Sequence, residues 1–134
     1  MTFSRRTRVL GGLVMLLCLG TACSNPAAPT ASSLKVVNTG LTDIRGLVVY
    51  FPQSTVDFGD VRAGGETALQ PVTGGVYSYA AFAFKLDGKL IQQPVIDWTG
   101  EKPLDGFKFA YDVALVSGRD GSPIIQIKSV SGVP

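Results

Sequence analysis

The chain has 134 residues, with 12 basic side chains, 10 acidic ones and no histidine, and both cysteines and both methionines lie within its first 23 residues. Three arginines also lie there, so the remainder carries nine basic and ten acidic side chains, a net charge of about −1. A chain without a Lys/Arg cluster is not expected to bind nucleic acid. A domain without imidazole or sulfur ligands is not expected to carry copper or zinc, so only oxygen-ligand metals such as calcium remain open, and we expect no cofactor.

The first segment combines a basic start with a short apolar run. Arg5, Arg6 and Arg8 precede an uncharged run of 11 residues from Val9 to Leu19. This length is typical of the apolar core of a signal peptide, whereas a transmembrane helix needs about 20 residues. The sequence therefore predicts a signal peptide at residues 1–22.

The end of this segment resembles the lipobox of bacterial lipoproteins, with Gly20, Thr21 and Ala22 followed by Cys23. The resemblance implies cleavage after Ala22, a diacylglyceryl group on the Cys23 sulfur and a further acyl chain, such as palmitate, on the new amino terminus. Two or more acyl chains hold a protein firmly on a membrane, whereas one chain does so only marginally. The alternative is an ordinary secretory signal that places a cysteine near its cleavage site.

Two further features concern export and destination. Ser4-Arg5-Arg6 is similar to a twin-arginine signal, although Arg8 stands where that pattern prefers an apolar residue, so the Sec and Tat routes both stay open. Ser24 stands where many lipoproteins of the inner membrane carry Asp. The resemblance therefore implies an extracytoplasmic, lipid-anchored protein, on the outer membrane if the host has one.

Beyond Cys23 the composition changes twice. Residues 23–33 contain Pro26 and Pro29 and no charge, which predicts a flexible, lipid-anchored linker. Residues 34–134 form a single domain in which Gly or Pro recurs about every twelve residues, a spacing typical of short strands. We expect an all-β, immunoglobulin-like antiparallel β-sandwich of about seven to eight strands, at residues 34–37, 47–51, 56–61, 66–72, 76–86, 89–93, 107–116 and 124–130.

Individual patterns support this fold. Between residues 107 and 116, apolar side chains alternate, which predicts a core strand with one set facing the opposite sheet: Phe107, Phe109, Tyr111, Val113 and Leu115. Asp87-Gly88 predicts a hairpin turn, and Asn38-Thr39-Gly40 predicts a turn that uses positive φ.

Two strings of residues carry a resemblance to known families. Val56 to Val61, followed by Gly65-Glu66-Thr67, resembles a strand and turn of immunoglobulin-like modules in bacterial surface proteins. The domain from Val36 to Tyr111 is also similar to small bacterial lipoproteins whose role is uncharacterised. These resemblances imply a sandwich and transfer no active site.

The longest irregular connection, residues 93–106, contains the only tryptophan. In one interpretation Trp98, Asp97 and Glu101 form a recognition surface, because binding residues gather on loops. In the other, which we favour, Trp98 closes the end of the sandwich. Asp97 and Glu101 also suggest a general acid/base pair, but nothing in the sequence sets their separation.

Tyr77 and Tyr79 are expected to share a strand face with Ala81 and Ala83. If that face is open, it is a surface for a glycan or a partner strand; if it is covered, as we favour, both rings belong to the core. Calcium ligands at Asp57, Asp60 and Asp120 are a weaker hypothesis, since Asp is a common turn residue.

The sequence thus favours a membrane-anchored lipoprotein with a non-enzymatic role in binding or envelope assembly, whose partner is an envelope protein or a glycan. Two alternatives remain: a small enzyme that acts on envelope polymers through Asp97 and Glu101, and a carrier of an apolar ligand held between the sheets.

Overall fold

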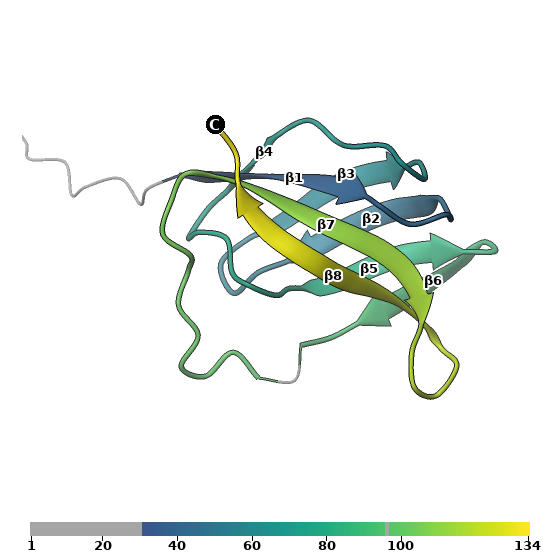
Figure 1. Cartoon of the computed structure of the whole chain (residues 1–134). Helices are drawn as coiled ribbons and strands as arrows, with labels where there is room; N and C mark the ends of the chain where they lie inside the picture. Colours follow the sequence, from purple (N-terminus) through teal and green to yellow (C-terminus); the bar gives the residue numbers. More distant parts are fainter. Residues whose placement is uncertain (1–30, 96) are drawn as a thin grey trace, which may run out of the picture.

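The computed structural model describes residues 31–95 and 97–134. The predicted signal peptide, Cys23 and most of the predicted linker lie outside the described residues. Within the described ranges eight strands form two four-stranded sheets (Figure 1), which confirms the all-β sandwich. The strands are β1 Ser32–Asn38, β2 Ile44–Tyr50, β3 Thr55–Val61, β4 Gln70–Val72, β5 Ala81–Leu86, β6 Lys89–Gln93, β7 Lys108–Ser117 and β8 Pro123–Gly132.

The first sheet has the strand order β4-β1-β7-β8 and the second has the order β3-β2-β5-β6. Every named pair is antiparallel except β1 and β7, which run parallel from Ser33 beside Lys108 to Asn38 beside Val113. This pair departs from the expected antiparallel pattern. The chain between β1 and β7 passes through the second sheet, so no tight hairpin has to join them.

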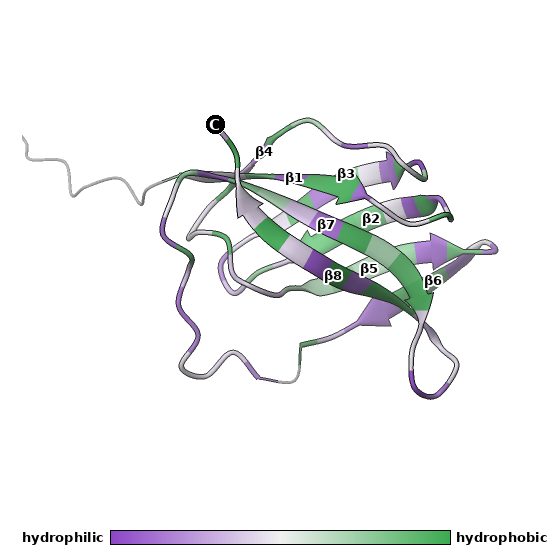
Figure 2. Ribbon diagram, in the orientation of Figure 1, coloured by the Kyte–Doolittle hydropathy of each residue, from purple (hydrophilic) through white to green (hydrophobic). Residues whose placement is uncertain are grey.

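The core lies between the sheets and follows the two-residue period of the strands. In β1, buried side chains alternate with half-buried ones along the whole strand, and apolar and polar bands follow one another along β8 (Figure 2). A single contiguous cluster of apolar side chains joins both sheets, including Leu34, Val36, Ile44, Leu47, Val49, Phe84, Tyr111 and Val113. Among the described residues no helix is long and apolar enough to cross a membrane.

Of the side chains predicted to face the opposite sheet from β7, Phe109, Tyr111 and Val113 are buried and Leu115 is half-buried, but Ala110 and Ala114, expected on the other face, are buried as well. The prediction is wrong at Phe107, whose side chain is 65% exposed. Phe107 precedes the first residue of β7, and its carbonyl accepts a hydrogen bond of 2.7 Å from the backbone N–H of Ser33 at the edge of the sandwich. The side chain therefore lies beyond the cover of the opposite sheet.

Two predicted strands are shorter than expected. Of residues 66–72 only Gln70–Val72 form a strand, because the Thr67 hydroxyl, rather than a backbone carbonyl, accepts the N–H of Val36 at 3.0 Å. Of residues 76–86 only Ala81–Leu86 form a strand. The preceding residues cross from one sheet to the other.

The predicted hairpin between β5 and β6 is confirmed, and Asp87 and Gly88 both have positive φ, at 50° and 76°, as the tight turn requires. The predicted turn at residues 38–40 is different: Asn38 is the last residue of β1 and is fully buried. Ser32 and Ser33, expected in the linker, are the first residues of β1.

Candidate functional site

The loop between β6 and β7 places Trp98 against two tyrosines. The Trp98 ring stacks on Tyr79, with ring centroids 5.0 Å apart and an interplanar angle of 15°. It also meets Tyr77 edge-on, with centroids 5.3 Å apart and an angle of 70°. Trp98 and Tyr79 are both half-buried, whereas Tyr77 is buried. We call the half-exposed pair of Trp98 and Tyr79 the aromatic pair.

The aromatic pair continues inward as a chain of rings. Tyr77 stacks on Phe51 and Phe51 packs against Tyr111, each with a centroid distance of 6.2 Å. The hydroxyl of fully buried Tyr111 donates a hydrogen bond to the backbone carbonyl of Tyr77, and burial raises the pKa of Tyr111 above its ordinary value. Trp98 thus closes the end of the core on its inner side, as we favoured, while part of its surface stays accessible.

Hydrogen bonds fix the loop that carries Trp98. The Tyr79 hydroxyl donates to the Asp97 carbonyl at 3.0 Å, and the Glu101 N–H donates to the Trp98 carbonyl at 3.1 Å. Further along, the Leu104 N–H donates to the Val76 carbonyl at 2.7 Å. These bonds hold the aromatic pair in one orientation, so a partner would meet a preformed surface.

Close backbone contact also holds this loop. Gly75 has a φ of +97°, and a Cβ on it would lie 2.5 Å from the Cβ of Pro103. Only glycine allows the two segments to approach this closely.

The charged groups of the loop serve its shape. The Asp97 carboxylate accepts the Thr99 N–H at 2.7 Å, and hydrogen bonds from Thr99 hold the pKa of Asp97 below its ordinary value. Partial desolvation, and then the nearby Glu101 carboxylate, raise the pKa of Tyr79 above its ordinary value. The Asp97 carboxylate thus makes a turn contact within its own loop.

Two hollows border this region. One, of about 480 Å³, runs along β8 and has Tyr79 and Gln93 on its wall. The Gln93 side-chain amide spans the gap to β8, donating to the Ile125 carbonyl at 2.9 Å and accepting the Ile125 N–H at 2.7 Å. The Gln93 side chain thereby occupies the N–H and the carbonyl of Ile125, which a strand added at the edge of β8 would otherwise use.

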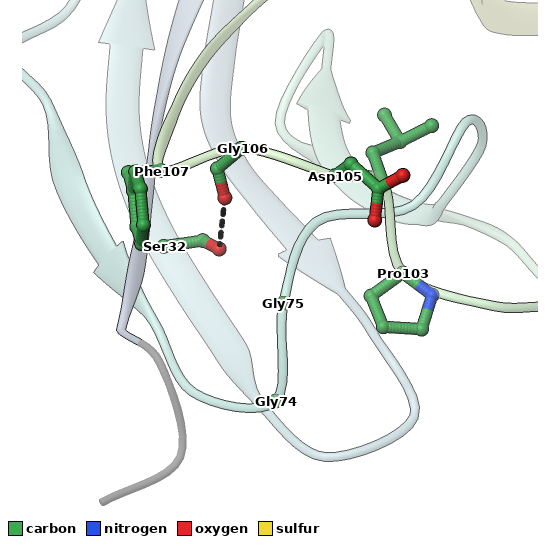
Figure 3. Close-up of a pocket in the computed structure, with 8 residues that line it drawn as sticks. Ser32, Gly74, Gly75, Pro103, Asp105, Gly106 and Phe107 are labelled. Carbon is green, nitrogen blue, oxygen red and sulfur yellow. Dashed lines mark hydrogen bonds between the residues drawn. The ribbon is translucent and has the colours of Figure 1, made fainter.

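The second hollow, of about 380 Å³, lies where β1 begins (Figure 3). Its wall includes Gly75, Pro103 and Phe107, and the Ser32 hydroxyl donates to the Gly106 carbonyl at 3.5 Å.

The structure brings the predicted site residues together around Trp98: both tyrosines contact its ring, Asp97 precedes it and the Glu101 N–H donates to its carbonyl. Asp97 and Glu101 are exposed. Tyr77 does not share an open strand face with Tyr79, because residues 76–80 are not a strand; it belongs to the core. The predicted lipidation site, Cys23, lies outside the described residues.

Two of the carboxylates considered as calcium ligands make local turn contacts, and the third, Asp60, bonds across to β2. Asp57 accepts the Gly59 N–H at 2.9 Å, and Asp120 accepts the Ser122 N–H at 2.9 Å. Asp60 accepts the N–H of Gly46 at 2.8 Å. In the part of the chain that the structure describes, no three potential metal-ligating side chains of His, Cys, Asp or Glu come together.

Sequence reasoning missed the exposure of Phe107 and the bridge from Gln93 to β8. Neither has a local signal, since both depend on which strands lie side by side. Comparison of the chain with protein-family models, with curated proteins and with solved structures finds no match to any of them.

Proposed function

We propose that this protein is a lipoprotein of the cell envelope, made as a precursor with a signal peptide at residues 1–22 and anchored by acyl chains on Cys23. The basic start, the short apolar run and the small residues before Cys23 support this proposal. The folded domain begins at Ser32, only nine residues beyond Cys23. The anchor therefore holds the sandwich close to the extracytoplasmic face of the membrane, the outer membrane where the host has one.

The sandwich is a non-enzymatic module for binding or envelope assembly. The observation that carries this part of the proposal is the aromatic pair, a half-exposed stack of Trp98 on Tyr79 held on a fixed loop. Aromatic rings supply large contact areas at little cost in conformational entropy, and Trp and Tyr are enriched in binding interfaces. The carboxylates of Asp97 and Glu101 form a polar rim beside the rings, which suits an envelope protein or a glycan as the partner.

The lipid anchor is tested by the mass of the mature protein. The purified protein should begin at Cys23 and carry the added mass of a diacylglyceryl group and a further acyl chain. The Cys23→Ser variant should keep its full precursor mass. A mature protein that begins near Ala22 with an unmodified thiol would overturn the anchor.

The binding surface is tested by photo-crosslinking in intact cells, with a photoreactive phenylalanine at position 98. Position 90 is the matched control, because Leu90 is also an exposed apolar residue but follows the hairpin turn, at the other end of β6 from the loop. We expect one discrete adduct from position 98 and none from position 90, with mass spectrometry showing whether it contains a peptide or a sugar. The same adducts from both positions, or none from position 98, would contradict the proposal.

A further inference from the structure

Three distant segments of the chain meet where β1 begins. The Ser33 N–H donates to the Phe107 carbonyl at 2.7 Å, and the Val133 N–H donates to the Lys108 carbonyl at 2.9 Å. The start of β1 and the carboxyl terminus therefore lie at one end of the sandwich (Figure 1). We call it the entry end, because the chain enters the domain there.

The entry end carries an exposed apolar side chain. Phe107 is 65% exposed and lies between two hollows. One is the hollow of about 380 Å³ that Ser32 and Pro103 line (Figure 3), and the other, of about 360 Å³, is lined by Lys108, Val133 and Pro134 among others. The Phe107 ring, together with neighbouring Val133 and Pro134, therefore presents an apolar surface that the rest of the domain does not cover.

The chain outside the described domain limits what can lie opposite this end. Eight residues separate Cys23 from Ser32, and the nine Cα-to-Cα steps between them span at most about 30 Å when fully extended and about half of that as a random coil. The far end of the sandwich lies at least the length of β1 away, about 20 Å at 3.3 Å per residue. An anchor on Cys23 therefore keeps the entry end closer to the bilayer than the far end.

We propose that the entry end docks on the lipid surface, with Phe107 as its apolar contact. This inference rests on the proposed anchor at Cys23. The tether raises the local concentration of lipid to the millimolar range, so a weak contact is enough to orient the domain. Lys108 and Asp105 beside Phe107 offset each other in charge, so the contact is expected on zwitterionic and anionic lipids alike.

The test uses the acylated protein in vesicles of phosphatidylcholine, with and without phosphatidylglycerol. Both natural cysteines lie in the first 23 residues, and Cys23 is acylated in the proposed product, so an introduced cysteine is the only free thiol. Pro134→Cys places an environment-sensitive dye beside Phe107. Leu41→Cys places the same dye on a fully exposed side chain beyond the far end of β1.

We expect nitroxide-labelled lipid to quench the dye at position 134 several-fold more strongly than the dye at position 41. Adding Phe107→Ser should lower the quenching at position 134 several-fold, to the smaller excess over position 41 that the tether alone leaves. Leu90→Ser is the matched control, because Leu90 is 61% exposed and follows the turn at the opposite end. It should leave the quenching at position 134 unchanged.

Failure of the anchor and failure of the docking differ in outcome. Protein that does not float with the vesicles would refute the anchor and, with it, the docking. Protein that floats but is quenched equally at both positions, or is quenched at position 134 to the same extent with and without Phe107, would refute the docking alone.

Discussion

The buried side chain of Asn38 leads to the most detailed prediction from this structure. Its amide donates to the carbonyls of Thr42 at 2.9 Å and Val61 at 3.1 Å, and its oxygen accepts the Gly40 N–H at 3.0 Å. The side chain is fully buried. It thus joins the end of β1, the following loop and the end of β3.

Two substitutions separate the hydrogen bonds from the charge. Asn38→Ala removes three bonds of about 1 kcal/mol each, so we expect a loss of about 3 kcal/mol. Asn38→Asp preserves the shape but turns a donor toward two carbonyl oxygens into an acceptor. A protonated carboxyl can donate to one of these carbonyls, so in that form the loss of stability is limited to about 1–2 kcal/mol. At pH 7, binding that proton costs the folded protein about 4 kcal/mol more, because the pKa of the carboxyl in the unfolded chain is near 3.9.

The sign of the pH dependence follows from the environment of the new group. Burial beside carbonyl oxygens raises the folded-state pKa of the new carboxyl above its unfolded value. The Asn38→Asp variant therefore has its full stability below about pH 4 and loses it at about 1.4 kcal/mol per pH unit as the pH rises. A total loss of about 5 kcal/mol at pH 7 approaches the whole stability of a domain this size.

The measurement is urea unfolding between pH 4 and 7, followed by the fluorescence of Trp98, which is half-buried and the only tryptophan. Gln126→Glu is the matched amide-to-acid control, since Gln126 is exposed and accepts a bond from Lys128 at 2.7 Å. Its difference from the unmodified protein should stay near zero. If the difference between Asn38→Asp and the unmodified protein does not change with pH, the proposed role of Asn38 is wrong.

Three further predictions concern the packing and the charges. Phe109→Ala should lower the free energy of unfolding by about 3–5 kcal/mol because its ring is buried, whereas Phe107→Ala should change it by less than about 0.5 kcal/mol; urea titration distinguishes them. Gly75→Ala should cost about 2–4 kcal/mol in thermal unfolding, since it adds a clash with a proline ring to the strain of positive φ, and Gly121→Ala, with open space around it, should cost only the strain. Hydrogen bonds from the Gly46 N–H and the Arg45 guanidinium hold the pKa of Asp60 below its ordinary value. The ionised carboxylate therefore stabilises the folded protein at neutral pH, and this stabilisation is lost as the pH falls. Asp60→Asn should reduce the loss of stability between pH 5 and 2, as measured by the midpoints of urea unfolding.

Features that depend on neighbouring residues were predictable from the sequence. The alternation from Phe109 to Val113 identified the buried face of β7, and Asp87-Gly88 identified the hairpin that joins β5 to β6. Both signals are local, because a strand has a two-residue period and a tight turn needs positive φ at two positions.

Features that depend on side chains from distant parts of the chain were not predictable. Residues 66–72 have the composition of a strand, but the hydroxyl of Thr67 accepts the N–H of Val36 and replaces a ladder bond. The parallel pairing of β1 with β7 likewise has no local signal, since it depends on the path of the chain through the second sheet.

The candidate site was predicted in part, and the missing part has one cause. The irregular composition predicts the loop with Asp97, Trp98 and Glu101, but the two-residue period of a strand places its partner Tyr79 on one face with Tyr77. That period applies only while the chain stays in a sheet.

The chain crosses from one sheet to the other at residues 76–80. This crossing interrupts the two-residue period and also exposes the aromatic pair. Residues 76–80 leave the first sheet, and the Tyr77 carbonyl, which has no ladder partner there, accepts the hydroxyl of Tyr111 from across the core. Tyr77 is thereby drawn inward, while Tyr79, two residues later, bonds the Asp97 carbonyl with its hydroxyl and stacks on Trp98. A continuous strand would have turned both tyrosines to one side. The half-exposed aromatic pair therefore exists because the chain changes sheets at this point, and the buried hydroxyl of Tyr111 supports it from within the core.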